Sequence, residues 1–139
     1  MSAKDKFHNV VKTALQKDEW VITNNPLRIP IDKITNMYIY LAAEKLIVAD
    51  KKGEKIAVEV KSFLGASNLS EFHTALGQFI NYRYALEDFE AEIILYLAIP
   101  LKTYEEFFTT PFVQSVVERS NINLLIFDPD KEEVVQWKR

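Results

Sequence analysis

The spacing of hydrophobic positions changes along the 139-residue chain, and each spacing predicts a different type of element. In residues 4–17 the apolar side chains recur at helical intervals with lysines on the opposite side, which predicts an amphipathic helix. A second helix is predicted over 70–87, and a third over 104–119 with an interruption at Pro111. Alternating or continuous apolar runs predict strands. These runs cover 20–23, the second half of 38–50, 55–63, 91–99, 124–127 and 134–137.

The order of these elements, α-β-β-β-α-β-α-β-β, predicts one α/β domain over residues 1–139. A mixed central sheet would be flanked by helices. The run at 91–99 is continuously apolar, which is typical of a central strand covered on both faces. Together with the strand at 55–63 and the helix between them, it predicts a parallel crossover. Residues 51–54 predict the turn of a hairpin that ends in the strand at 55–63.

The composition of the chain excludes several kinds of site and several classes of protein. The chain has no cysteine, which excludes disulfides and thiolate zinc sites and fits a reducing cytoplasm. No apolar run is long enough to span a membrane, and the first residues lack the core of a signal peptide. The net charge of −3 argues against a protein that coats nucleic acid by bulk charge. A nuclease remains compatible with this charge, because its metal site is itself acidic.

The tripeptide Glu59-Val60-Lys61 carries the strongest chemical signal, because it ends a run of buried-strand character. Alternation along a strand places Glu59 and Lys61 on the same face. A carboxylate there can hold Mg²⁺, and a lysine can orient a water molecule or stabilise developing charge, as a phosphodiester-cleaving enzyme requires. The alternative is a structural ion pair on a half-exposed strand.

A metal site requires a second carboxylate, and the hairpin register chooses between Glu44 and Asp50. With the turn centred on 52–53, Glu44 is a diagonal neighbour of Glu59, at roughly 7–8 Å between backbones. Asp50 lies opposite Lys55, about 13 Å from Glu59 along the strand. We therefore predict Glu44 and Glu59 as the metal ligands. A shift of one residue would turn Glu44 to the other face, and an ion pair with a neighbouring lysine is its alternative role.

The helix after the motif supplies two further candidates, Gln78 and Tyr82, which share a helical face. Both side chains can hydrogen-bond a phosphate or a metal-bound water. The alternative is a solvated Gln78 and a core Tyr82 with its hydroxyl at the edge. Asn68 and Glu71 resemble a capping box at the start of this helix. Its apolar ridge is expected at Phe72, Leu76, Phe79, Ile80 and Tyr84.

The first predicted helix adds acid–base candidates. His8 titrates near neutrality and is a candidate to support catalysis, the alternative being a half-exposed histidine without a role. Asp5, Asp18 and Glu19 lie on this helix or at its ends, and one of them could reach the site. His73 is expected to be exposed.

The strand-borne Glu59-Val60-Lys61 and the following Gln78-Phe79-Ile80-Asn81-Tyr82 resemble the PD-(D/E)XK nuclease superfamily, whose restriction-endonuclease-like core this implies. More closely, nearly the whole chain is similar to the XisH family of cyanobacterial fdxN element excision controlling factors. The residues that carry this resemblance are 7–9, 11–15, 20–23, 43–46, 56–65, 72–79 and 81–83.

The resemblance implies a role in the excision of a DNA element, beside a site-specific recombinase and a small companion protein, XisI. In one place the chain departs from the pattern. An Asp-Leu-Gly-Ala-Glu-like stretch is expected before the hairpin, and the chain has Tyr40-Leu41-Ala42-Ala43-Glu44 instead. Glu44 is therefore the nearby acid that remains.

Two functional hypotheses follow. In the first, the protein is a Mg²⁺-dependent endonuclease that acts on DNA through Glu44, Glu59, Lys61 and Gln78, with Tyr82 and His8 in support. In the second, it is a catalytically inactive nuclease fold that binds XisI or the recombination complex, with an exposed patch of Phe107, Phe108 and Phe112. A homodimer through an edge strand at 134–137 fits either hypothesis, although the charges of Lys138 and Arg139 disfavour open pairing.

Overall fold

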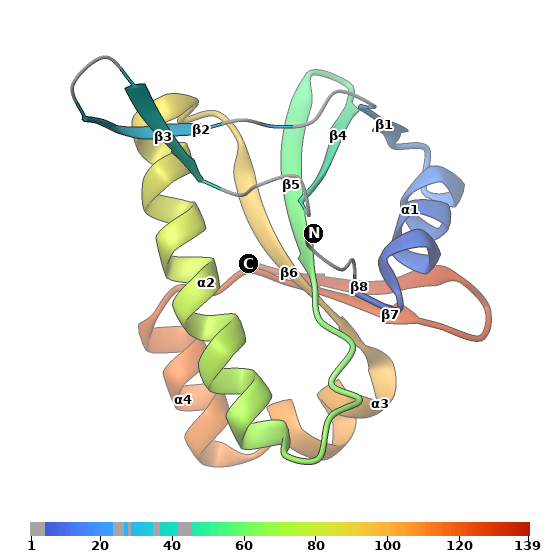
Figure 1. Ribbon diagram of the computed structural model, residues 1–139. Helices are drawn as coiled ribbons and strands as arrows, with labels where there is room; N and C mark the ends of the chain where they lie inside the picture. The colour runs from blue at the N-terminus through green and yellow to red at the C-terminus, as the bar shows by residue number, and fades with distance from the viewer. Residues whose placement is uncertain (1–4, 24–26, 28, 35–36, 42–45) are drawn as a thin grey trace.

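The computed structural model in Figure 1 describes residues 5–23, 27, 29–34, 37–41 and 46–139. The helices are α1 (His8–Lys17), α2 (Asn68–Phe89), α3 (Leu101–Thr103) and α4 (Pro111–Arg119), with a π-helical turn, η1 (Tyr104–Phe108), before α4. The strands are β1 (Val21–Ile22), β2 (Ile29–Ile34), β3 (Met37–Leu41), β4 (Ile47–Lys51), β5 (Glu54–Val60), β6 (Ile94–Pro100), β7 (Leu124–Asp128) and β8 (Glu133–Lys138). Among the described residues, no helix is long and apolar enough to cross a membrane.

The main sheet has six strands in the order β1-β4-β5-β6-β7-β8. Strands β5, β6 and β7 run parallel to one another, and the remaining pairs are antiparallel. The predicted mixed α/β fold is thus confirmed, and β5 and β6 are joined by the predicted parallel crossover through α2. Strand β8 forms one edge of the sheet, as predicted. Its pairing with a second copy of the chain stays a prediction.

The hairpin of β4 and β5 has the register that the sequence predicted. Ile47 pairs with Val58, and Asp50 pairs with Lys55 beside the turn. Lys52 and Gly53 form the turn with positive φ angles of 50° and 82°, which is the backbone of a two-residue hairpin connection. Glu44 lies outside the described residues, so its place opposite Lys61 stays a prediction.

Helices cover both faces of the sheet, and each face has its own core. Figure 1 shows α2 and α4 on one side and α1 on the other. Alternation along β5 divides its side chains between the two sides: Ala57 packs in the core under α2, whereas Ile56 and Val58 pack in the core under α1. The large residues of the α2 side include Phe72, Phe79, Phe108, Leu97 and Ile126, and those of the α1 side include Leu15, Trp20, Tyr96 and Phe127.

A second sheet, which the hydrophobic pattern did not reveal, consists of the antiparallel pair β2 and β3. The hydrophobic pattern presented 38–50 as one continuous apolar stretch. In the structure this stretch contains most of β3, then residues outside the described part, and then β4. Ile29 of β2 is buried in the core on the α2 side. In Figure 1 this hairpin crosses the end of α2, so the small sheet extends the core beyond the main sheet.

Two details of α2 differ from the prediction. Ser67, not Asn68, caps the helix, because its hydroxyl accepts the backbone N–H of Ser70 at 3.1 Å. Glu71 Oε2 accepts the backbone N–H of Gly65 at 2.7 Å, and thereby ties the preceding loop to the first turn. The buried ridge contains Tyr82, whereas Tyr84 is 59% exposed. The helix is therefore rotated slightly relative to the ridge that the sequence favoured.

The prediction of a patch of three exposed phenylalanines is wrong for Phe108, which is buried. Phe108 is 1% exposed and packs edge-to-face against Phe63 and Phe72, with ring centroids 5.4 and 5.6 Å apart. Phe107 is partly buried beside it, and Phe112 alone is largely exposed, at 66%. The π-helical turn η1 places two consecutive aromatic rings toward the core, which a regular helical spacing would not predict.

This aromatic cluster generates a stability prediction. Phe108→Ala should lower the free energy of unfolding by about 3–5 kcal/mol, because it removes a fully buried ring and leaves a cavity. Phe112→Ala is the matched control and should change it by less than about 0.5 kcal/mol. Urea denaturation followed by circular dichroism measures both values. Equal effects of the two substitutions would contradict the assignment of Phe108 to the core.

A candidate active-site pocket at the end of strand β5

A pocket with a cavity volume of about 200 Å³ lies at the carboxyl end of β5. It gathers residues from the start of α1, from the end of β5 and from the middle of α2. The lining residues are Asp5, His8, Leu46, Glu59, Val60, Lys61, Gln78 and Tyr82. Five residues predicted from the sequence as catalytic, metal-binding or supporting thus line one cavity, and the sixth, Glu44, lies outside the described residues.

The polar pair Glu59 and Lys61 comes from the central strand of the main sheet. Glu59 is 7% exposed and lies opposite Leu97 of β6 in the parallel ladder. The backbone N–H of Lys61 donates to Ala98 O at 3.0 Å, so the pairing with β6 continues one residue beyond β5. Both side chains belong to the face that Ala57 shares with α2. Lys61 is half-buried and lines the same pocket as the buried Glu59.

Helix α2 contributes Gln78 and Tyr82 to the same pocket. Tyr82 is buried in the core on the α2 side, and Gln78 is half-buried. The alternative that Tyr82 is a core aromatic is therefore correct for its ring, and the residue also lines the cavity. Gln78 keeps part of its surface exposed, so the alternative of a solvated Gln78 is correct in part. One turn of helix separates the two residues, so their polar groups approach the pocket from one side.

The start of α1 closes the pocket from the other side. Asp5 Oδ1 accepts the backbone N–H of Phe7 at 2.9 Å, and Asp5 Oδ2 accepts the backbone N–H of Ser62 at 2.9 Å. One carboxylate therefore joins the beginning of α1 to the chain that leaves β5. His8 is 4% exposed, so the half-exposed alternative for this histidine is wrong, whereas His73 is exposed as predicted.

The sequence treated Asp5 only as one of several acids that could reach the site. An Asp side chain can accept the backbone N–H two residues on in an Asx turn, and Asp5 does so just before α1. That signal could have assigned Asp5 to the start of α1. The contact with Ser62 joins residues 57 positions apart, and no local pattern reports it.

The backbone is strained where it leaves the pocket. Phe63 has a φ of +56°, which is uncommon for a bulky residue and costs on the order of 1–3 kcal/mol. Burial of its ring against Phe108 and Phe107 offsets this cost. The strained residue turns the chain away from the sheet immediately after Lys61 and Ser62, and thereby ends the strand beside the pocket.

These groups define the chemistry that the pocket can perform. Carboxylate oxygens are the ligands that Mg²⁺ prefers, and Glu59 supplies them from a rigid strand. Lys61 supplies a cation, Gln78 an amide, Tyr82 a hydroxyl and His8 an imidazole. Within the described part of the chain, no three His, Asp or Glu residues form a group that could hold a metal ion. A metal site here requires a further acid, and the sequence predicts Glu44 for that role.

The chain was also compared with known proteins. Its sequence matches the model of the XisH protein family over residues 1–135. This chain belongs to the XisH family. None of the curated proteins matches it.

Two crystal structures are similar over almost the whole XisH chain. An XisH family protein from Nostoc punctiforme PCC 73102 is 50% identical, with a TM-score of 0.84, and the match covers 97% of this chain and 100% of that one. An fdxN element excision controlling factor protein from Anabaena variabilis is 48% identical, with a TM-score of 0.83, over 96% and 98% of the two chains. The resemblance inferred from the sequence is thereby confirmed at the level of the family.

The double contact of Asp5 generates a prediction for this XisH protein. Asp5→Ala should lower the free energy of unfolding by about 1–2 kcal/mol, because two backbone N–H groups lose their acceptor. It should also speed hydrogen exchange of the Ser62 amide. Asp5→Asn retains one carbonyl oxygen and should lose less. Asp130→Ala, in the exposed turn after β7, is the control, and unchanged Ser62 exchange in Asp5→Ala would contradict the linking role.

Proposed function

We propose that this XisH protein controls the excision of a DNA element and acts on DNA through the pocket at the end of β5. The observation that carries the proposal is the convergence of Glu59, Lys61, Gln78, Tyr82 and His8 on one cavity. These residues come from three separate elements. The relative from Anabaena variabilis is an fdxN element excision controlling factor protein, which supports this biological setting.

The chemistry that fits these groups is metal-assisted cleavage of a phosphodiester. Glu44 and Glu59 would hold Mg²⁺, which supplies Lewis-acid assistance when bound. Lys61 would orient a water molecule or stabilise charge that develops on the phosphate. Gln78 and Tyr82 would hydrogen-bond the phosphate from α2, and His8 would support the site from α1. Because Glu59 is buried, its charge acts in a medium of low dielectric, where it attracts a cation more strongly than in water.

Calorimetric titration of Mg²⁺ or Mn²⁺ tests the metal site. The wild type should bind the metal in the micromolar to millimolar range, and Glu59→Gln should weaken binding at least about tenfold by removing a ligand charge. Lys61→Met should retain the metal and lower cleavage of single-stranded or branched DNA by about a hundredfold. Glu87→Gln, at an exposed position of α2, is the control for loss of a carboxylate. If Glu59→Gln binds metal and cuts DNA like the wild type, the assignment of the site is wrong.

A second candidate function is a catalytically inactive nuclease fold that binds a companion protein. The net charge of −3 favours it, as does Tyr40 in place of the acid expected before the hairpin. Phe112 is the largely exposed phenylalanine of the expected patch, at 66%, and is where a partner would dock. In this case the pocket would be retained for its contribution to the fold.

Co-purification distinguishes the two candidates. If the protein is an interaction module, the wild type should form a stable complex with the XisI-like companion and show no heat of Mg²⁺ binding. Phe112→Ser should then weaken the complex about tenfold or more, because exposed aromatic residues often dominate interfaces. Glu59→Gln should leave the complex intact. A wild type that binds Mg²⁺ and fails to bind the companion would exclude this candidate.

A further inference from the structure

A second hollow, with a cavity volume of about 320 Å³, lies at the opposite end of β5. It shares no lining residue with the pocket around Glu59. Glu54 in this hollow and Glu59 in the other pocket are five residues apart, which is about 17 Å along a strand. The lining residues are Asp18, Trp20, Lys51, Lys52, Glu54, Tyr96, Trp137 and Arg139.

Three aromatic rings form one side of this hollow. The ring of Trp137 lies 4.9 Å from that of Tyr96, edge to face, and 5.7 Å from that of Trp20, with all distances between centroids. Trp20 and Tyr96 are buried, whereas Trp137 on the edge strand β8 is half-buried. Trp137 is thus a rigidly packed ring with surface left for a further planar group, a property that stacking sites require.

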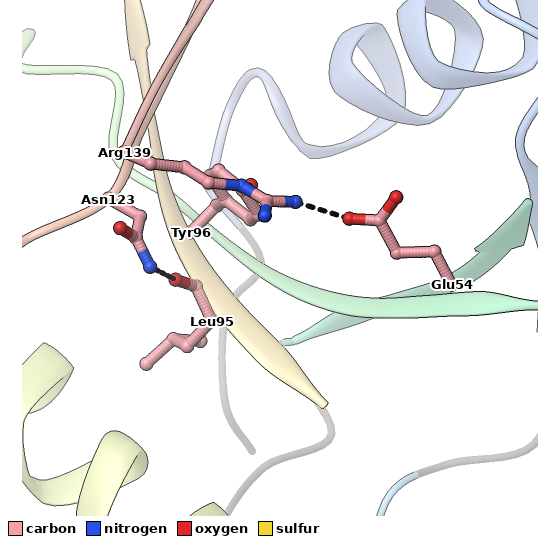
Figure 2. Close-up of polar contacts among 5 residues, drawn as sticks. All are labelled: Glu54, Leu95, Tyr96, Asn123 and Arg139. Carbon is pink, nitrogen blue, oxygen red and sulfur yellow. Dashed lines mark hydrogen bonds and ion pairs between the residues drawn. The ribbon is translucent and has the colours of Figure 1, made fainter. Parts of the chain in front are cut away.

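The charged groups around the rings are arranged in pairs. Lys51 Nζ lies 5.8 Å from the centroid of the Trp20 ring and donates to Asp18 O at 2.7 Å. Arg139 lies over the ring of Tyr96 and pairs with Glu54, as Figure 2 shows. It also donates a hydrogen bond to the Tyr96 hydroxyl. The hydrogen bond with Tyr96 raises the pKa of Arg139 further above its ordinary value, so the guanidinium group stays charged.

A third cation, Lys52, stands in the hairpin turn at the rim of the hollow and is exposed. The rim therefore carries three cations and two carboxylates. Each of the two described pairs, Lys51 with Asp18 and Arg139 with Glu54, is neutral by itself. The side chains that line the hollow thus have a formal net charge of +1, and both Arg139 and Lys51 have further N–H donors because their described bonds do not use all of them.

This arrangement discriminates between classes of ligand. A cationic ligand is disfavoured, because the aromatic faces of Trp20 and Tyr96 already carry Lys51 and Arg139. A purely apolar ligand would desolvate the charged rim without compensating it. A planar aromatic ligand with an anionic group can use both the ring of Trp137 and the cations. The volume is at the lower end of the range of small-ligand pockets, about 300–1,000 Å³.

We propose that this hollow binds a nucleotide unit, with its base against Trp137 and its phosphate at the rim formed by Lys52 and Arg139. The carboxylates of Asp18 and Glu54 accept hydrogen bonds from the amino groups of the base or from a sugar hydroxyl. An acidic peptide would meet these two carboxylates with like charge and offer them no side-chain donor. The nucleotide can be free, or it can be one unit of a single strand, since the recognising chemistry is the same. This site needs no metal and does not depend on Glu59.

The two tryptophans of the chain, Trp20 and Trp137, both line this hollow. Intrinsic tryptophan fluorescence of the full chain therefore reports on it selectively. The titration uses adenosine 5′-monophosphate, and then a short single strand of deoxyadenosine, in a buffer with a metal chelator. We expect saturable quenching.

Two substitutions test the cations at the rim. Arg139→Gln and Lys52→Asn should each weaken binding about tenfold, and asparagine tolerates the positive φ of the turn at position 52. Lys102→Gln, at an exposed position of α3, is the control and should bind like the wild type.

Each outcome decides the proposal. Quenching by the mononucleotide supports a site for a free nucleotide, and quenching by the single strand alone supports a site for one unit of a strand. The same response to inorganic phosphate would overturn the proposal, because it would show an anion site without a base. Saturable binding of an acidic aromatic peptide but of neither nucleotide, or no response up to about 10 mM ligand, would also overturn it. Since the buffer contains no free metal, none of these results depends on Mg²⁺ binding at Glu59.

Discussion

The parallel pairing of β5 with β6 is the constraint on which the rest of the structure depends. A parallel pair cannot be closed by a tight turn, so the chain must leave β5, cross one face of the sheet and return to the start of β6. Here the loop at 61–67 runs beyond the sheet before α2 turns back (Figure 1). Consequently the middle of α2, and not its first turn, passes the end of β5. This is why Gln78 and Tyr82 line the same pocket as Glu59 and Lys61.

The pocket also depends on how the exit of β5 is held. The Asp5 carboxylate binds the backbone at Ser62 and at Phe7, so the beginning of α1 is attached to the end of the central strand. The strained backbone of Phe63 follows immediately and is held by the aromatic cluster under α2. Local strain of this kind persists only when the surrounding packing determines it. The stability of the core and the geometry of the pocket are therefore coupled at three consecutive residues, 61–63.

The two hollows use β5 in different ways. At its carboxyl end, a buried acid and a lysine meet hydrogen-bonding groups from two helices, which suits chemistry on a phosphate. At its beginning, the hairpin turn and β8 surround packed aromatic rings with paired charges, which suits recognition of a planar anion. A strand with buried neighbours on both sides is a rigid support for both sites. The two hollows share no lining residue, in keeping with the separation of about 17 Å that we infer along β5.

The sequence by itself determined the order of the strands of the main sheet and of the helices between them, the hairpin register and the shared face of Glu59 and Lys61. Each of these follows from a short-range periodicity: a period of two along a strand, or a two-residue turn that sets the pairing of its flanks. Within the described residues the register of 47–51 with 54–58 agrees with that reasoning. The family resemblance, carried by motifs spread over most of the chain, was likewise present in the sequence.

Only the tertiary structure decided that Phe108 is buried, that Tyr82 and not Tyr84 belongs to the ridge, and that Asp5 reaches Ser62. It alone brought Trp20 together with Trp137. These facts depend on the rotation of a helix about its axis and on contacts between residues far apart in the chain, and a local pattern specifies neither.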